Sequence, residues 1–511
     1  MAHLVWFSAG VLWAGALAVL VGQARGVRRA RLWWVALLAA ALAWLLGVLA
    51  VVAAARWFPL PWQGAEVWSW PHDAVSGARG WRLGEAQRPL LLLALTAVWA
   101  VLLVDAARAE RVPSEGYGWA AVLGAGGLAV PAVLAATPVA WVMSWVALDA
   151  AAFVADVGRL SRPKHRNQAV WVLFLRGASW FMALGGAAAA GGTLAAAGMA
   201  LWGGALALRL TVAAFQPAVV ASDRPPWRVT LAAANMLATL AAVAWLHRSA
   251  AAAPGWMVWG AALLAWWGAW RWGAAGTPLR AVGAGGMALG GLALLSALAG
   301  AWQASLAWAW LAVALPLGMA LAPHRGRLLW PFFAVLALPL GLLPFTPGQA
   351  AAAVWAPPFH AWMLLAWLAL AASGVALGRQ GMRLPADCPH ATREGRAFCL
   401  FGLALWAAVV GLGWLWPPLR GVREGQGWLW GLTALGGAAV WLGMTGRGYL
   451  HTDRAEAWVA RGAALTTGAL FWGAYRSMGR TLRFFSLLLE GEGGVLWALV
   501  LLAMLAVLVQ H

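Results

Sequence analysis

Three ionisable side chains, Asp149, Arg176 and Arg209, lie inside long runs of apolar residues. A charge within a membrane-spanning helix is costly, so it is usually paired with an opposite charge or belongs to an ion pathway. A buried carboxylate such as Asp149 can bind and release a proton, whereas a guanidinium keeps its proton and acts as a fixed positive charge. The residue types therefore predict either a structural ion pair or a proton site in which an arginine biases an acid.

Lysine, the cation that can release a proton when buried, is nearly absent from the chain. The one lysine, Lys164, follows a long apolar run in a basic segment at 159–167 that we expect to be a connecting loop. Isoleucine is missing and tyrosine is rare, whereas arginine and tryptophan are abundant. A GC-rich genome would explain this usage, and under that explanation arginine should stand where lysines have been lost.

The composition indicates a polytopic membrane protein, because 63% of the residues are hydrophobic and 10% are charged. Apolar runs long enough to cross roughly 30 Å of hydrocarbon recur along the chain, without the alternation of barrel strands. We expect an all-α membrane helix bundle of about 14–17 transmembrane helices. The runs lie near 4–22, 32–55, 89–107, 118–136, 139–158, 168–188, 195–220, 229–246, 255–270, 279–300, 303–321, 328–345, 359–378, 398–416, 427–445 and 493–510.

The formal net charge of +19 is distributed as topology requires and does not indicate a nucleic-acid partner. Arginines gather in alternate connectors, near 25–31, 159–166 and 379–396, while the connectors near 190, 301 and 349 carry almost no basic residues. This positive-inside pattern predicts an N-terminus outside the cytoplasm. We expect a multi-pass protein of a bacterial cytoplasmic (inner) membrane.

The chain divides into N-terminal helices (1–117), two five-helix blocks (118–246 and 255–378) and C-terminal helices (398–511). Each block contains a run that is interrupted by proline, at Pro217 and at Pro344, which favours inverted repeats of the transporter kind. Segment 453–489 is either a further span or a lateral amphipathic helix, with Arg476 and Arg480 on one face. We favour the lateral helix, since it keeps the arginines on the cytoplasmic side.

Four motifs in the order of these runs resemble the antiporter-like subunits of the respiratory NADH:quinone oxidoreductase, the Mrp antiporters and the membrane-bound hydrogenases. The segment Trp145–Val154 resembles the fifth helix of that family, and Leu175–Gly177 resembles its sixth. Ala205–Pro217 followed by Pro226–Met236 is similar to the broken seventh helix and the start of the eighth. Gly341–Gly348 is similar to the turn in the twelfth helix, with Gln349 in place of phenylalanine.

The residues that carry protons in that family are replaced here by apolar ones. Aligned on these motifs, the glutamate of the fifth helix falls on Val146 and the lysine of the seventh on Val212. The histidine and lysine of the eighth helix fall on Ala232 and Ala238, and a polar run in the tenth becomes Ala284–Gly286. Because the lost lysines did not become arginines, codon usage does not explain the change.

The resemblance implies a degenerate antiporter-like subunit that binds other membrane subunits of a larger complex and has a reduced or lost proton path. Asp149 and Arg209 each lie about one turn from a replaced position, so they form either a displaced charge pair or a purely structural one. Arg176 matches the arginine of the sixth helix and is expected to anchor its helix. No motif indicates a flavin, iron–sulfur, nicotinamide or metal site, so any redox role would be that of a non-catalytic subunit.

Three other interpretations stay open. The chain is also compatible with a stand-alone transporter that uses Asp149 as its proton site, and with the membrane partner of an inorganic-carbon-uptake complex. A polytopic glycan transferase is a weaker alternative, based on charges in the segment 56–88: Asp73, Arg79, Arg82, Glu85 and Arg88. Cys388, His390 and Cys399 fall short of a tetrahedral metal set, so we expect ordinary reduced cysteines.

Overall fold

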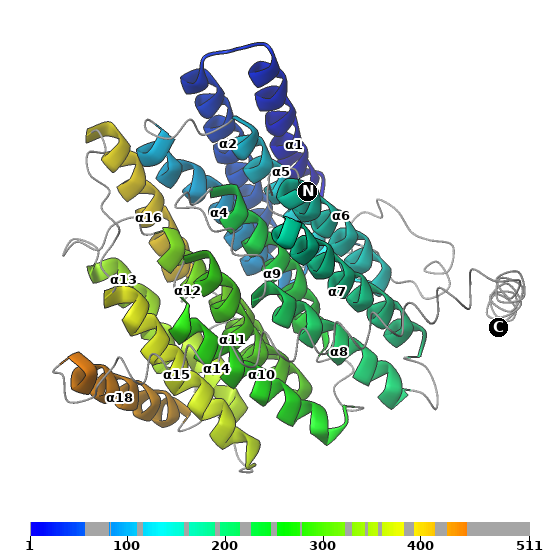
Figure 1. The fold of residues 1–511 in the computed structure, drawn as a ribbon, viewed down its shortest axis with the longest axis vertical. Coiled ribbons are helices and arrows are strands. Elements are labelled where there is room, and N and C mark those ends of the chain that lie inside the picture. Colours follow the sequence, from blue (N-terminus) through cyan, green and yellow to red (C-terminus); the bar gives the residue numbers. More distant parts are fainter. Residues whose placement is uncertain are drawn as a thin grey trace, which may run out of the picture. The chain divides into compact units, whose positions relative to one another are not determined.

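The computed structural model describes a bundle of α-helices in the part of the chain that can be placed. The described residues are 2–56, 81, 83–109, 116–157, 163–189, 195–214, 226–246, 253–275, 278–321, 330–342, 346–355, 360–382, 393–413 and 427–446. In these ranges there are sixteen α-helices, and the one β contact is an isolated bridge between Trp81 and Ala135. The expected all-α helix bundle is confirmed (Figure 1).

The described helices lie in both halves of the chain. In the first half they are α1 (Ala2–Ala24), α2 (Arg29–Arg56), α4 (Gln87–Ala109), α5 (Gly116–Leu134), α6 (Pro138–Val157), α7 (Pro163–Ala188), α8 (Ala195–Ala214) and α9 (Pro226–Leu246). In the second half they are α10 (Gly255–Ala274), α11 (Pro278–Leu298), α12 (Trp302–Leu321), α13 (Trp330–Ala337), α14 (Pro347–Ala351), α15 (Trp362–Met382), α16 (Arg393–Gly413) and α18 (Gly427–Gly446).

Proline marks the start of several helices. α6, α7, α9, α11 and α14 all begin with proline, whose fixed φ suits the first helical position, where no N–H bond is lost. One expectation is corrected by this rule. Because α7 begins at Pro163, Lys164 belongs to its first turn and not to a connecting loop.

One helix of the second block is broken before Pro344, the position that the sequence suggested. α13 ends at Ala337 and is followed by a 3-10 turn, Leu338–Gly341. The next residue, Leu342, has a left-handed backbone with φ of 53°, which ends the helix. Helical structure resumes at Pro347, whereas Pro217, where we expected the corresponding interruption, lies outside the described residues.

Eight helices in the described ranges are long and apolar enough to cross a membrane: α1, α2, α4, α5, α8, α11, α12 and α15. Five further apolar helical stretches of 10–17 residues lie within α6, α7, α9, α16 and α18. α11 and α12 are buried along their whole apolar windows, whereas about a third of the window of α1 is buried. The protein is therefore a multi-pass membrane protein with α11 and α12 at its core.

Glycine allows the closest helix packing in this core. A Cβ on Gly291 of α11 would lie 2.7 Å from the backbone nitrogen of Ala265 in α10, and a Cβ on Gly268 would collide with the backbone at Ala288. The two helices can approach this closely only without side chains at these positions. Within the two expected blocks, α5 packs against α6 and α9, and α10 packs against α11 and α15.

Candidate functional site

The buried charges predicted from the sequence meet where four helices of the first block pack together. α6 carries Asp149, α7 carries Arg176, and α8 carries Arg209. α6 contacts α7 and α9, and α8 contacts the same two helices. All three charged side chains are buried, with 0% of Asp149 and 4% of each arginine exposed. We call these three residues the charge cluster.

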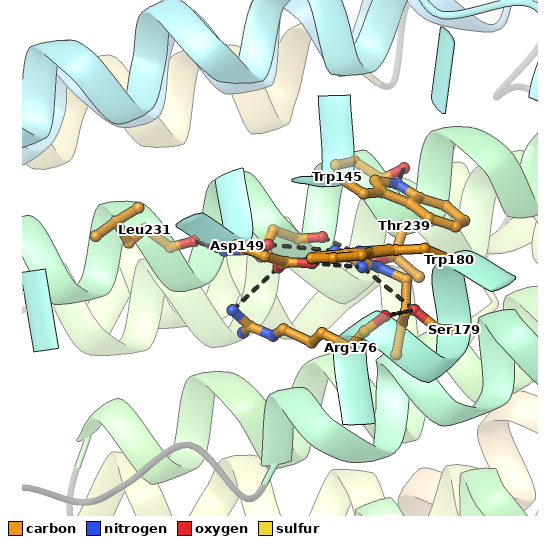
Figure 2. A network of polar contacts seen from close by, with 10 residues as sticks. Trp145, Asp149, Arg176, Ser179, Trp180, Leu231 and Thr239 are labelled. Carbon is orange, nitrogen blue, oxygen red and sulfur yellow. Dashed lines mark hydrogen bonds and ion pairs between the residues drawn. The ribbon is translucent and has the colours of Figure 1, made fainter. Parts of the chain in front are cut away.

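Both carboxylate oxygens of Asp149 accept two donors each. Oδ1 lies 3.1 Å from Nη1 of Arg176 and accepts a hydrogen bond from Nη2 of Arg209 at 3.2 Å. Oδ2 accepts from Nη1 of Arg209 at 2.8 Å and from Nε1 of Trp180 at 2.9 Å (Figure 2). A carboxylate offers about four lone-pair sites, so its acceptor capacity is filled.

Arg209 is held in place by neutral groups as well as by the carboxylate. Its guanidinium donates to Thr239 at 3.3 Å, to Ser179 at 3.4 Å and to Asn235 at 3.4 Å. The guanidinium carbon also lies 4.4 Å from the ring centroid of Trp145, a cation–π contact. The planar guanidinium is thus fixed by a two-point contact with Asp149, three polar neighbours and an aromatic face.

The polar neighbours are themselves anchored to the backbone. Asn235 donates to the carbonyl of Leu231, and Thr239 donates to the carbonyl of Asn235. Nε1 of Trp145 donates to the carbonyl of Ala238 in α9, which links α6 to α9. The hydrogen bonds that surround the cluster are visible together in Figure 2. The cluster is consequently part of a fixed network, and each of its members has little freedom to turn.

The arrangement surrounds one carboxylate with N–H donors. The three charges sum to one net positive charge, and Asp149 is the one member that can take up a proton. A proton on Asp149 would occupy a place where an N–H donor now lies and would remove the negative charge that both guanidinium groups contact. Trp180, Ser179, Thr239 and Asn235, which also contact the cluster, do not change charge at physiological pH.

The residues that align with the proton carriers of the antiporter-like family are apolar, and most of them are buried. Val212, Ala232 and Ala238 are all buried. Val146 is 38% exposed, whereas Asp149 is fully buried. Of these two residues of α6, Asp149 therefore occupies the inner position.

The second block has no comparable cluster within its described residues. Its buried polar side chains are uncharged, namely Ser296, Ser305, Thr346 and Ser373, and so is the buried Gln380 just beyond it. Gln380 of α15 donates to the carbonyls of Trp272 and Ala275 at the end of α10, at 3.4 and 2.9 Å. These contacts join helices and do not link ionisable groups.

Sequence reasoning missed a second buried acid near the ends of two helices. Asp105 of α4 accepts a hydrogen bond at 2.8 Å from Nε1 of Trp119, near the start of α5. The signal was present, because Asp105 stands at the end of an apolar run. The described residues hold no group of three or more His, Cys, Asp or Glu that could bind a metal.

Other sequence candidates lie apart from the cluster or outside the described residues. Glu85 and Arg88 lie at the start of α4, whereas Asp73, Arg79 and Arg82 are outside the described residues. Cys399 is buried in α16, and Cys388 and His390 are outside the described residues. Segment 453–489, expected to be a lateral helix or a further span, is also outside them.

Comparisons with known proteins identify solved structures of similar fold but no protein of similar sequence. No protein-family model matches the sequence, and no curated protein matches it. A chain in the structure of the Mrp complex from Dietzia sp. DQ12-45-1b matches with a TM-score of 0.66 and 14% identity, over 98% of this chain. The match covers 62% of the Mrp chain, so the present chain spans less than two thirds of its length.

A second solved structure gives the same result. A chain of respiratory complex I from Thermus thermophilus, with bound aureothin, matches with a TM-score of 0.56 and 17% identity. This match covers 80% of the present chain and 98% of the complex I chain. The protein therefore has the antiporter-like fold of the membrane subunits of Mrp complexes and respiratory complex I.

Proposed function

We propose that the protein is an antiporter-like membrane subunit of a multi-subunit complex, in which it has a largely structural role and a reduced or lost proton path. The fold supports the class of subunit, because both matched chains belong to multi-subunit membrane complexes. The observation that carries the proposal is the fully occupied carboxylate of Asp149, which two arginines and Trp180 hold between three helices.

A proton path through this site would need carriers on both sides of Asp149. The nearest ionisable neighbours are Arg176 and Arg209, and guanidinium groups do not release protons in proteins. The expected lysine positions at Val212 and Ala238 are apolar and buried, so no carrier continues the path along α8 or α9. The charge cluster accordingly acts as a clamp that joins α6, α7 and α8.

We also propose that residues 118–246 and 255–378 are two inverted five-helix repeats. The first keeps a charge cluster, and the second has none among its described residues. The contacts of α5 with α9 and of α10 with α15 are consistent with equivalent packing in the two blocks. The arginines between α1 and α2 support an N-terminus outside the cytoplasm of a bacterial inner membrane.

A stand-alone proton-coupled transporter is the competing function, because Asp149 is a buried acid within the membrane-spanning bundle. The two functions differ in what purifies with the protein. We expect the full chain, extracted from its native membrane in a mild detergent, to bring down other membrane subunits in fixed ratio. A single chain that catalyses proton-coupled transport on its own would overturn the proposal.

The matched control uses the same membrane extracted in a harsher detergent. Subunit contacts should be lost there, while the chain itself stays monodisperse because the buried network of Figure 2 lies inside one chain. Copurification that is equally strong in both detergents and has no fixed ratio would indicate nonspecific association and would contradict the proposal.

A further inference from the structure

An open apolar groove lies on the outside of the bundle, away from the charge cluster. It has a volume of about 430 Å³ and is formed by α8, α10 and α11. Residues of α11, among them Met287 and Leu294, are buried, whereas Gly260 and Leu263 of α10 are exposed along its edge. The groove therefore opens to the outside of the bundle, beside two helices, α8 and α11, that are long and apolar enough to cross a membrane.

The groove is long enough for an extended hydrocarbon chain. Its α10 wall extends from Trp256 to Trp267, which corresponds to roughly 16 Å along a helix. A volume of about 430 Å³ along this wall leaves room for one acyl chain.

The wall offers an apolar surface with few polar groups. Thr211 contributes a hydroxyl, but it is already bonded to the carbonyl of Ala207 at 2.7 Å. Gly260 leaves open space, because a Cβ added there would meet no atom within 4 Å. A hydrocarbon chain would fill this space with dispersion contacts and would leave no hydrogen bond unmade.

Two arginines stand at one end of the groove. Arg271 follows Trp267 by four residues in α10, so it lies on the same helix face about 6 Å further along the axis. Arg280 lies in the first turn of α11, close enough to Arg271 for their positive charges to interact, and is exposed. Guanidinium groups are suited to bind phosphate at this end.

We propose that this groove binds one acyl chain of an anionic phospholipid, whose phosphate contacts Arg271 and Arg280. The apolar wall accounts for the chain, and the two positive charges select an anionic headgroup over a zwitterionic one. A helix of another subunit is the other candidate occupant, and the two arginines beyond the end of the groove favour the anionic lipid.

The test compares lipid retention by the full purified chain in native mass spectrometry. The probes are phosphatidylglycerol and phosphatidylcholine with identical acyl chains, added to delipidated protein. We expect wild type to retain phosphatidylglycerol in preference, and Arg280→Gln to weaken that preference about fivefold, the effect of one basic residue at a membrane surface. Equal retention of both lipids by wild type would overturn the charge selection.

A second pair of variants tests the acyl site independently of charge. Gly260→Leu should fill the groove and lower the retention of both lipids at least fivefold, while Gly436→Leu in α18 should not. Both glycines have open space around a new Cβ, so both variants should fold and melt like wild type. Unchanged retention in a folded Gly260→Leu variant would refute the lipid site.

The competing occupant has its own readout. A photo-crosslinking residue at position 260, activated in native membranes, should capture phospholipid. A protein adduct of defined mass at that position would instead assign the groove to a neighbouring subunit and would overturn the proposal.

Discussion

Replacing Asp149 with asparagine removes the negative charge of the cluster while nearly preserving the shape of the side chain. Arg209 loses a two-point ion pair at 2.8 and 3.2 Å, and Arg176 loses its contact at 3.1 Å. The asparagine amide nitrogen would also face donors where Oδ2 now accepts from Arg209 and Trp180. Removing one partner of a buried ion pair costs roughly 3–5 kcal/mol, so we expect a loss of that size in the free energy of unfolding.

The measurement is equilibrium unfolding of the purified chain in mixed micelles, with SDS as the denaturant. A charge-restoring variant serves as the control. Asn235 lies 3.4 Å from Nη2 of Arg209, so Asn235→Asp in the Asp149→Asn background returns a carboxylate to the same guanidinium from α9. This double variant should recover a large part of the loss. Wild-type stability of Asp149→Asn would show that the charge cluster contributes nothing and would refute the reasoning.

Three further predictions use the same unfolding assay. Arg209→Lys should destabilise the chain by about 1–3 kcal/mol, because an ammonium cannot contact both carboxylate oxygens and Trp145 as a guanidinium does; unchanged stability would count against the two-point contact. Gly268→Ala should lower the free energy of unfolding by about 1–3 kcal/mol, because the new Cβ collides with the α11 backbone, whereas Gly260→Ala should leave it unchanged. Equal effects of the two variants would contradict the close packing of α10 and α11. Gln380→Glu should lower the free energy of unfolding by about 1–3 kcal/mol, because a carboxylate cannot donate to the carbonyls of Trp272 and Ala275. Wild-type stability of this variant would show that these hydrogen bonds do not stabilise the fold.

The helices could be predicted from the sequence because long apolar runs and initial prolines are local signals. The runs near 139–158 and 303–321 correspond closely to α6 and α12. The sequence prediction placed the break in the second block too late. The true position depends on the left-handed backbone at Leu342, which leucine rarely adopts and which its residue type therefore does not predict. The start of α7 was missed because the basic residues after Pro163 look like a loop.

The candidate site could be predicted only in part. An acid and an arginine within apolar runs pointed to Asp149 and Arg209, and the structure places Oδ2 of the acid 2.8 Å from Nη1 of the arginine. The sequence could not show that Arg176 and Trp180 of α7 share the same carboxylate, because that depends on how α7 turns toward α6. Helical spacing also suggested a shared face for Val146 and Asp149, yet the packing of α6 buries only the second.

A lost proton path means that this chain does not conduct protons across a membrane. The deciding measurement is proton flux in tight liposomes that contain the purified full chain, under an imposed potential, with a pH-sensitive dye inside. A protonophore added at the end confirms that the vesicles held the gradient. We predict a flux equal to that of protein-free liposomes, because the carboxylate of Asp149 is fully occupied and no carrier continues the path in the described helices. A wild-type flux clearly above that of protein-free liposomes would contradict a lost proton path.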